Sequence, residues 1–91
     1  MNKERRTKLG EAVSWLNRSQ EYLERAKECV EDVRDAEEEA YDNLPEGIQE
    51  SERGETMQEN VDELDDVMSE IDDLYDSVEC QIDAINEIIE K

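Results

Sequence analysis

Eight carboxylates lie within one short stretch of the chain, and their type and close spacing make them the first candidates for a functional site. They lie in residues 62–77, DELDDVMSEIDDLYDS, whose first fifteen positions contain no Lys or Arg. Carboxylates at this density can ligate a metal ion or present negative charge to a basic partner. The eight are Asp62, Glu63, Asp65, Asp66, Glu70, Asp72, Asp73 and Asp76.

Metal binding and catalysis find little support elsewhere in the chain. Asp62, Asp66 and Glu70 are residue types that bind metals, but no Gly stands at an EF-hand turn position and helical spacing does not fit a loop. The chain has no His, which excludes His-based catalysis and carboxylate–His di-metal sites. It also lacks a Gly-rich phosphate loop and an activated nucleophile. We expect no catalytic residue, no enzymatic activity, no cofactor and no specific metal site.

The negative charge is concentrated in one part of the chain. The 91 residues carry a net charge of −19, which exceeds what solubility alone requires. Residues 1–34 have eight basic and seven acidic side chains, whereas residues 35–91 have two basic and twenty-two acidic ones. Charge of this size often marks disorder, but here the apolar residues are regularly spaced. One domain with an almost purely anionic second half is the prediction.

Apolar residues repeat at heptad spacing from about residue 3 to residue 42, which predicts a long amphipathic helix. We take Leu9 as heptad position a. Positions a and d are then expected to form the seam, the contact surface with a second helix. Position a holds Leu9, Leu16, Leu23, Val30 and Glu37, and position d holds Ala12, Ser19, Ala26, Val33 and Ala40. A further apolar row at g holds Trp15, Tyr22, Cys29 and Ala36.

A second helix is predicted over about residues 55–90, with a heptad frame of its own in which Met57 is position a. Thr56 with Glu59 fits a capping box, and Ser51 is an earlier candidate start. Position a holds Met57, Leu64, Ile71, Val78 and Ile85, and position d holds Asn60, Val67, Leu74, Gln81 and Ile88. The apolar row beyond this seam is position e, with Val61, Met68, Tyr75, Ile82 and Ile89.

The connector, about residues 43–54, predicts an antiparallel hairpin. Pro45 disfavours helix at Leu44, Gly47 and Gly54 permit turning, and PEGIQES can form a helical turn with Ile48 closing the core. A short connection makes the helices antiparallel neighbours. Residues whose numbers sum to 97 then face each other, for example Leu23 with Leu74 and Val30 with Val67. The predicted fold is an all-α, coiled-coil-like hairpin of one domain, residues 1–91.

The surplus apolar rows, g in the first helix and e in the second, predict association. Two hairpins that form a four-helix bundle would cover these rows. We therefore expect a homodimer; the alternative is a docking face for another protein. The residues expected to carry dimerisation are Trp15, Tyr22, Met68, Tyr75 and Ile82.

Cysteine usage and hydropathy point to the cytoplasm. Two cysteines do not make a disulfide framework, and free thiols are typical of cytosolic proteins. In the predicted register Cys29 and Cys80 lie ~18 Å apart along the hairpin, too far for an internal disulfide. No apolar run approaches the ~20 residues of a membrane span, and the basic first ten residues lack the apolar region of a signal peptide.

The middle of the chain has a distinctive connector. Residues 39–64, EAYDNLPEGIQESERGETMQENVDEL, resemble small acidic helical proteins of bacterial prophages and other mobile elements, which share a YDNLPE…QESERGE connector followed by an acidic helix. The resemblance implies a phage or mobile-element context, and it assigns no role to any residue.

The acidic helix suggests two functions. Seven like-charged i,i+4 pairs cost on the order of 1.5–3.5 kcal/mol, which Lys at some positions would relieve. If the charge is used, the eight carboxylates mimic nucleic acid and block the basic cleft of a host defence nuclease, with a CRISPR effector favoured by analogy to other small acidic phage proteins. Otherwise the acidic side is a solvated face, and the chain is an adaptor that binds a partner helix through its surplus apolar row. Neither hypothesis involves direct contact with nucleic acid or a membrane.

Overall fold

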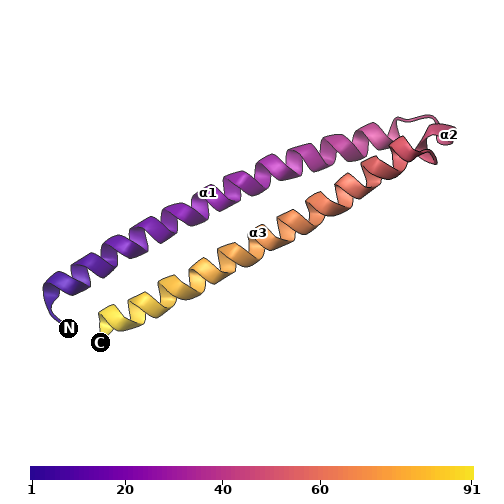
Figure 1. The fold of residues 1–91 in the computed structure, drawn as a ribbon. Helices are drawn as coiled ribbons and strands as arrows, with labels where there is room; N and C mark the ends of the chain where they lie inside the picture. The colour runs from indigo at the N-terminus through magenta and orange to yellow at the C-terminus, as the bar shows by residue number, and fades with distance from the viewer.

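The computed structural model describes residues 1–91 and forms the predicted antiparallel hairpin (Figure 1). Helices α1, Lys3–Asp42, and α3, Glu52–Glu90, are joined by the short helix α2, Glu46–Gln49. The two chain ends lie beside one another at the end opposite α2 (Figure 1). The molecule measures 69 × 15 × 13 Å and contains no strand. The all-helical class and the hairpin are therefore confirmed.

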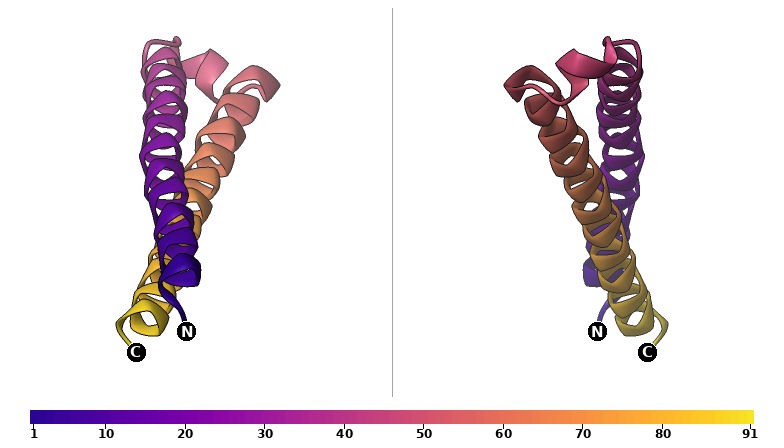
Figure 2. Two further views of the ribbon diagram at one scale, coloured as in Figure 1. Left: turned by 90° about the vertical axis from the view of Figure 1, so that its left-hand side faces the viewer. Right: turned by 90° about the vertical axis from the view of Figure 1, so that its right-hand side faces the viewer.

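The helix ends follow from local hydrogen bonding. Asn2 is the N-cap of α1, and its Oδ1 accepts a hydrogen bond of 2.9 Å from the backbone N–H of Arg5. After α1, Pro45 starts the short turn predicted in PEGIQES, which becomes α2. Seen from the sides, α1 and α3 cross at a shallow angle while α2 bridges them (Figure 2).

The second long helix begins after Ser51, the earlier of the two candidate starts. Ser51, rather than Thr56, precedes its first turn, and α3 starts at Glu52 instead of near residue 55. The reason lies at Gly54, which is helical and does not serve as a turn residue. A Cβ atom at Gly54 would stand 2.0 Å from the backbone oxygen of Gln49. The glycine therefore allows α2 to lie directly against the first turn of α3. The expected role of Ile48 is wrong, because its side chain is exposed and does not close the core.

The seam between the long helices uses positions a and e, so the predicted a/d seam is wrong. The partly or fully buried residues of α3 recur at a and e, and those of position d are mostly exposed. Position e of α3 is apolar at every heptad, whereas position d contains Asn60 and Gln81. Burying the more apolar row is favoured, and α1 adapts to it. The seam row of α1 consequently includes Gln20, Lys27 and Arg34.

The register is close to the predicted one. Three cross-helix pairs, such as Lys27 with Asp72, have residue numbers that sum to 99, and the bond from Gln20 to the backbone oxygen of Tyr75 gives 95, so the observed sums lie within two of the predicted 97. The difference of two residues is much smaller than a heptad. Leu74 and Val67, expected in the seam, are instead exposed by 55% and 41%. Both residues are at position d. Because α3 packs against α1 through positions a and e, position d falls at the side of the contact.

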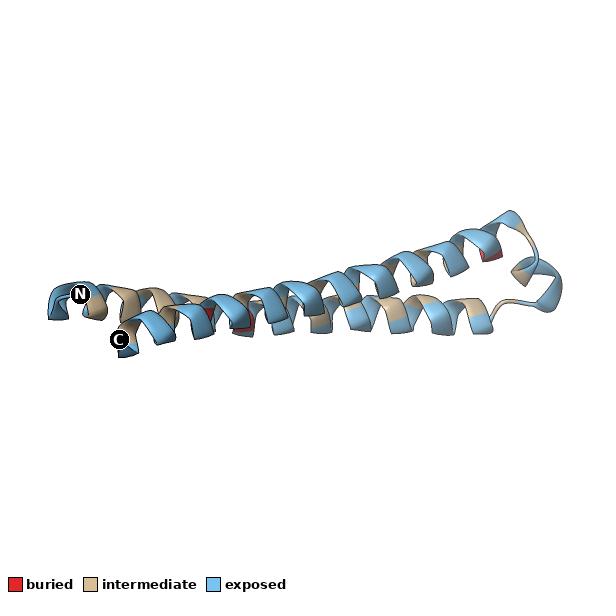
Figure 3. Cartoon of the chain, turned by 90° about the horizontal axis from the view of Figure 1, so that it is seen from below, coloured by how far each residue is buried: buried red, intermediate tan, exposed pale blue.

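The hairpin has very little core. Only three residues are buried, and of these only Ile82, at 5% exposure, is apolar (Figure 3). The other two are Gln20 and Gly54. The accessible surface is 6864 Å², compared with ~5,500 Å² for a compact protein of this mass. The radius of gyration is 20.4 Å, compared with ~12 Å for a compact chain of this length. The elongated hairpin leaves several large apolar side chains exposed, among them Trp15, Tyr22 and Leu74.

Candidate functional site

All eight carboxylates that the sequence singles out are exposed on α3. They do not form one uniform face. Asp65 and Asp72 flank the seam and pair with cations of α1. The remaining six make no ion pair and are called here the unpaired carboxylates. They are Asp62, Glu63, Asp66, Glu70, Asp73 and Asp76.

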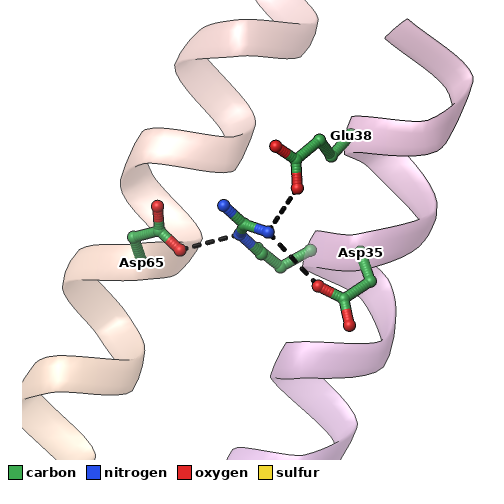
Figure 4. Close-up of polar contacts among 4 residues, drawn as sticks. Asp35, Glu38 and Asp65 are labelled. Atoms are coloured by element: carbon green, nitrogen blue, oxygen red, sulfur yellow. Dashed lines mark hydrogen bonds and ion pairs between the residues drawn. The ribbon is translucent and has the colours of Figure 1, made fainter. Parts of the chain in front are cut away.

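Arg34 joins the two helices through the first of these pairs (Figure 4). Its Nε donates a hydrogen bond of 2.8 Å to Asp65 Oδ1 on α3. Its Nη1 donates to Asp35 Oδ1 at 3.3 Å and also to Glu38 Oε2, both on α1. Hydrogen bonds to Asp65 and Asp35 raise the pKa of Arg34, which remains charged throughout. One guanidinium thus serves three carboxylates.

Lys27 and Gln20 repeat this arrangement at intervals of seven residues along α1. The Lys27 Nζ donates hydrogen bonds of 2.8 and 2.9 Å to the two Oδ atoms of Asp72, and this raises the pKa of the lysine. The Gln20 Nε2 donates to Glu79 Oε2 at 2.7 Å and to the backbone oxygen of Tyr75 at 3.3 Å. We call these three cross-helix pairs the polar ladder. They are Gln20–Glu79, Lys27–Asp72 and Arg34–Asp65.

The polar ladder changes the interpretation of the acidic helix. Within the helix itself, residues 62–76 have no cation, but α1 supplies two of them across the seam. Two carboxylates therefore support the fold, and six remain available to a partner. A signal for this was present in the sequence. Gln20, Lys27 and Arg34 recur every seven residues in the sequence, and in the structure each bonds to an acidic residue of α3.

The opposite flank of the hairpin is apolar and exposed. Two observations place its residues together: they occupy positions d and g, on the side of the seam away from the polar ladder, and Val33 and Val67 line a common hollow of about 310 Å³. Trp15 and Tyr22 are the most exposed, at 65% and 60%. We call this flank the apolar face. It consists of Trp15, Tyr22, Val33, Val67, Leu74 and Ile88.

The residues expected to carry dimerisation lie on two different surfaces of the structure. Trp15 and Tyr22 are exposed on the apolar face, as that hypothesis requires. Met68, Tyr75 and Ile82 instead lie in the seam within the hairpin, and Ile82 is its most buried side chain. The expectation that these three form a surplus row is wrong, because position e of α3 is a seam row.

Two arginines cover the aromatic rings of the apolar face. The Arg18 guanidinium lies 5.0 Å from the centroid of the Trp15 ring, and that of Arg25 lies 5.8 Å from the Tyr22 ring. Distances of this size allow cation–π attraction. Neither arginine forms an ion pair within the hairpin, so both guanidinium groups remain available to a partner.

No set of side chains converges as a metal or substrate site would. The carboxylates and thiols form no group of three or more that could hold a metal ion. The largest hollow, about 830 Å³, lies along the first turns of α1 and has no apolar lining residue. Cys29 and Cys80 are both exposed and free. The functional candidates are consequently two surfaces: the unpaired carboxylates and the apolar face.

Comparisons with protein-family models, curated proteins and solved structures gave no match for this chain. Neither long helix contains a stretch apolar enough to cross a membrane.

Proposed function

We propose that the protein is an acidic inhibitor that presents the unpaired carboxylates as phosphate surrogates to a basic nucleic-acid-binding cleft. The observation that carries this proposal is the set of six exposed carboxylates along residues 62–76, none of which has an intramolecular cation. Over this length of ~22 Å, duplex DNA presents ~13 phosphate charges. Six carboxylates supply about half of that number on one helix.

The partner that fits this surface is a protein whose Lys and Arg side chains normally bind phosphates. A host defence nuclease is such a protein, and a CRISPR effector is one example. The resemblance of residues 39–64 to small acidic prophage proteins supports a mobile-element origin and action in the bacterial cytoplasm. Two hairpins in a four-helix bundle would present two acidic bands, which would raise the charge density toward that of DNA.

The test compares two variants with equal changes in charge. The first replaces Asp62, Asp66, Asp73 and Asp76 by Asn, which removes four unpaired carboxylates from the outward rows of α3. The matched control replaces Glu21, Glu28, Asp32 and Glu39 of α1 by the corresponding amides. Those four are exposed, make no ion pair and occupy the equivalent outward rows. Asp65 and Asp72 are left unchanged because they stabilise the hairpin.

Each protein is immobilised and used to capture basic proteins from a bacterial host lysate treated with nuclease. We expect the unmodified protein and the α1 control to capture the same partner, which duplex DNA or RNA displaces and rising salt releases steeply. The α3 variant should lose the capture while circular dichroism shows unchanged helicity. Equal capture by the α3 variant would rule the proposal out.

The adaptor function is the alternative, and the exposure of the apolar face favours it. A partner helix that packs on Trp15, Tyr22 and Leu74 would bury apolar area, so its binding should hardly depend on salt. Loss of capture on Leu74→Glu, together with full capture by the α3 amide variant, would identify this function.

A further inference from the structure

We propose that the apolar face is covered by a second copy of this chain, with α1 of each copy lying over α3 of the other. This inference goes beyond the proposed function and does not depend on it. Glu63 and Glu70 stand at the edge of the apolar face, but the four carboxylates that the α3 amide variant changes, Asp62, Asp66, Asp73 and Asp76, lie away from it on the outward rows of α3. The inference also replaces the seam residues first expected to carry dimerisation.

The residues of the apolar face lie on one side of the hairpin. An α-helix turns by ~100° per residue, so position d lies ~80° from the centre of an a/e seam. In an antiparallel pair, equal heptad positions of the two helices fall on the same side. Position d of both helices therefore faces one way, with Trp15 and Tyr22 at the adjacent position g of α1. The polar ladder occupies the opposite side.

The area of this face matches what a stable homodimer needs. A hairpin of 69 × 15 Å offers on the order of 1,000 Å² per copy, or ~2,000 Å² in total, which is at the lower end of the range for permanent homodimers. The accessible surface of 6864 Å² also exceeds that of a compact protein of the same mass by roughly 1,400 Å². Covering the apolar face would remove most of this excess.

The charges of the two helices favour one of the two possible arrangements of the copies. Within its helical residues α1 has eight basic and twelve acidic side chains, whereas α3 has one basic and fifteen acidic. Two face-to-face arrangements have twofold symmetry. One of them stacks α3 on α3 and so brings the two most acidic helices together. The other places α1 over the second copy's α3, which separates the acidic helices diagonally.

The edges of the apolar face are complementary in this second arrangement. Arg25 stands beside the face on α1, over the Tyr22 ring, and Glu70 stands at the edge on α3. In the observed register Arg25 is level with residue 74, so Glu70 of the second copy is only about four residues, or ~6 Å, further along. Around this pair the face has a basic group on its α1 edge and an acidic group on its α3 edge, so it complements itself there under a twofold axis, as an isologous dimer requires.

The first measurement is the molar mass in solution, by sedimentation equilibrium at micromolar concentration. We expect twice the 10.6 kDa of one chain. Leu74→Glu places a charge in the centre of the face and should weaken the dimer by ~100-fold or more. Ser69→Glu adds the same charge at an exposed position off the face, so this control should remain a dimer. A 10.6 kDa mass for the unmodified chain would overturn the proposal and assign the face to another protein.

The two cysteines report on the covered side. Both are exposed in the single hairpin, but Cys29 is at position g beside the apolar face, and Cys80 is on the outward side of α3. A maleimide should therefore modify Cys29 more slowly in the unmodified protein than in Leu74→Glu, while Cys80 reacts equally in both. Equal reactivity of Cys29 in the dimer and the variant would contradict this choice of face, even if the mass were doubled.

The arrangement is tested by exchanging charge. Arg25→Glu and Glu70→Arg, made singly, should each weaken the dimer, and the double variant should restore much of the loss. If the double variant is weaker than either single one, α1 does not lie over the second copy's α3. Circular dichroism of each variant shows whether the hairpin is still folded.

Discussion

The half of the hairpin beside the chain ends differs from the half beside α2, although the same two helices build both. Near the chain ends most of the seam is aliphatic, with Leu9, Val13 and Leu16 on α1 and Ile82 and Ile85 on α3; Arg6 and Gln20 are the polar seam residues of this half. Both buried residues that lie between the long helices, Gln20 and Ile82, are in this half. The packing between the long helices is therefore tightest where the chain is open.

Toward α2 the seam becomes polar on one side. Lys27, Arg34 and Glu37 occupy seam positions of α1, and hollows of about 430 and 310 Å³ lie between the helices in this half. Contacts to Asp72 and Asp65 replace part of the apolar packing. The seam here depends on ion pairs, which contribute less per contact when they are solvated.

The difference has a simple physical explanation. The connector keeps the α2 ends of the two long helices close together, so contacts in that half form at a small cost in chain entropy. No covalent link joins the ends at Lys3 and Glu90, and only packing can hold them together. An aliphatic seam where the chain is open, and a polar seam where it is closed, is the distribution that this constraint favours.

The largest expected effect tests where the packing energy lies. Ile82→Ala should lower the free energy of unfolding by ~2–5 kcal/mol, the range for truncation of a buried Ile. Leu64→Ala, a truncation at a half-buried seam position in the half beside α2, should cost clearly less. Urea unfolding followed by circular dichroism, at one fixed protein concentration, measures both. Equal losses would show that the two halves contribute alike, and the comparison would fail.

A pair of glycine substitutions tests the closed end. Gly54→Ala would place a Cβ 2.0 Å from a backbone oxygen of Gln49, so α2 must move away from α3. We expect a loss of ~1–3 kcal/mol, as for overpacked sites. Gly10→Ala is the control, because a Cβ there has no atom within 4 Å. It should stabilise α1 by ~0.5–1 kcal/mol. Thermal unfolding of both variants gives the sign of each change in stability. If Gly54→Ala leaves the stability unchanged, a close contact of α2 with α3 is excluded.

Much of the fold follows from the spacing of apolar residues. Heptad repeats and the connector around Pro45 predict two long antiparallel helices, a helical turn between them and a register within two residues of the observed one. They do not predict which rows meet. Positions a and d and positions a and e have the same 3.5-residue spacing, and only the comparison of Asn60 and Gln81 with the fully apolar e row separates them.

The candidate site was harder to predict for a related reason. Interpreting each helix alone treats Asp65 and Asp72 like their neighbours, since the helix that contains them has no cation nearby. Their partners, Arg34 and Lys27, are distant in the sequence and become visible only once the seam is known. Reversing Asp65 and Asp72 to Lys should place like charges opposite Arg34 and Lys27 across the seam and weaken the hairpin.

The smallest expected effect concerns the polar half of the seam and depends on pH. The hydrogen bond to Asp72 raises the pKa of Lys27 in the folded hairpin. The unfolded chain has the ordinary lysine pKa of ~10.4, so the stabilisation from this pair is complete below that pH and is lost as pH rises through the higher folded pKa.

Arginine does not titrate in this range, so Lys27→Arg should keep the contribution. Urea midpoints measured across this window should therefore fall more for the unmodified protein than for Lys27→Arg. Lys3→Arg, at a position without an ion pair, is the control and should behave like the unmodified protein. Parallel curves for Lys27→Arg and the unmodified protein would mean that this pair contributes nothing measurable to the closed half.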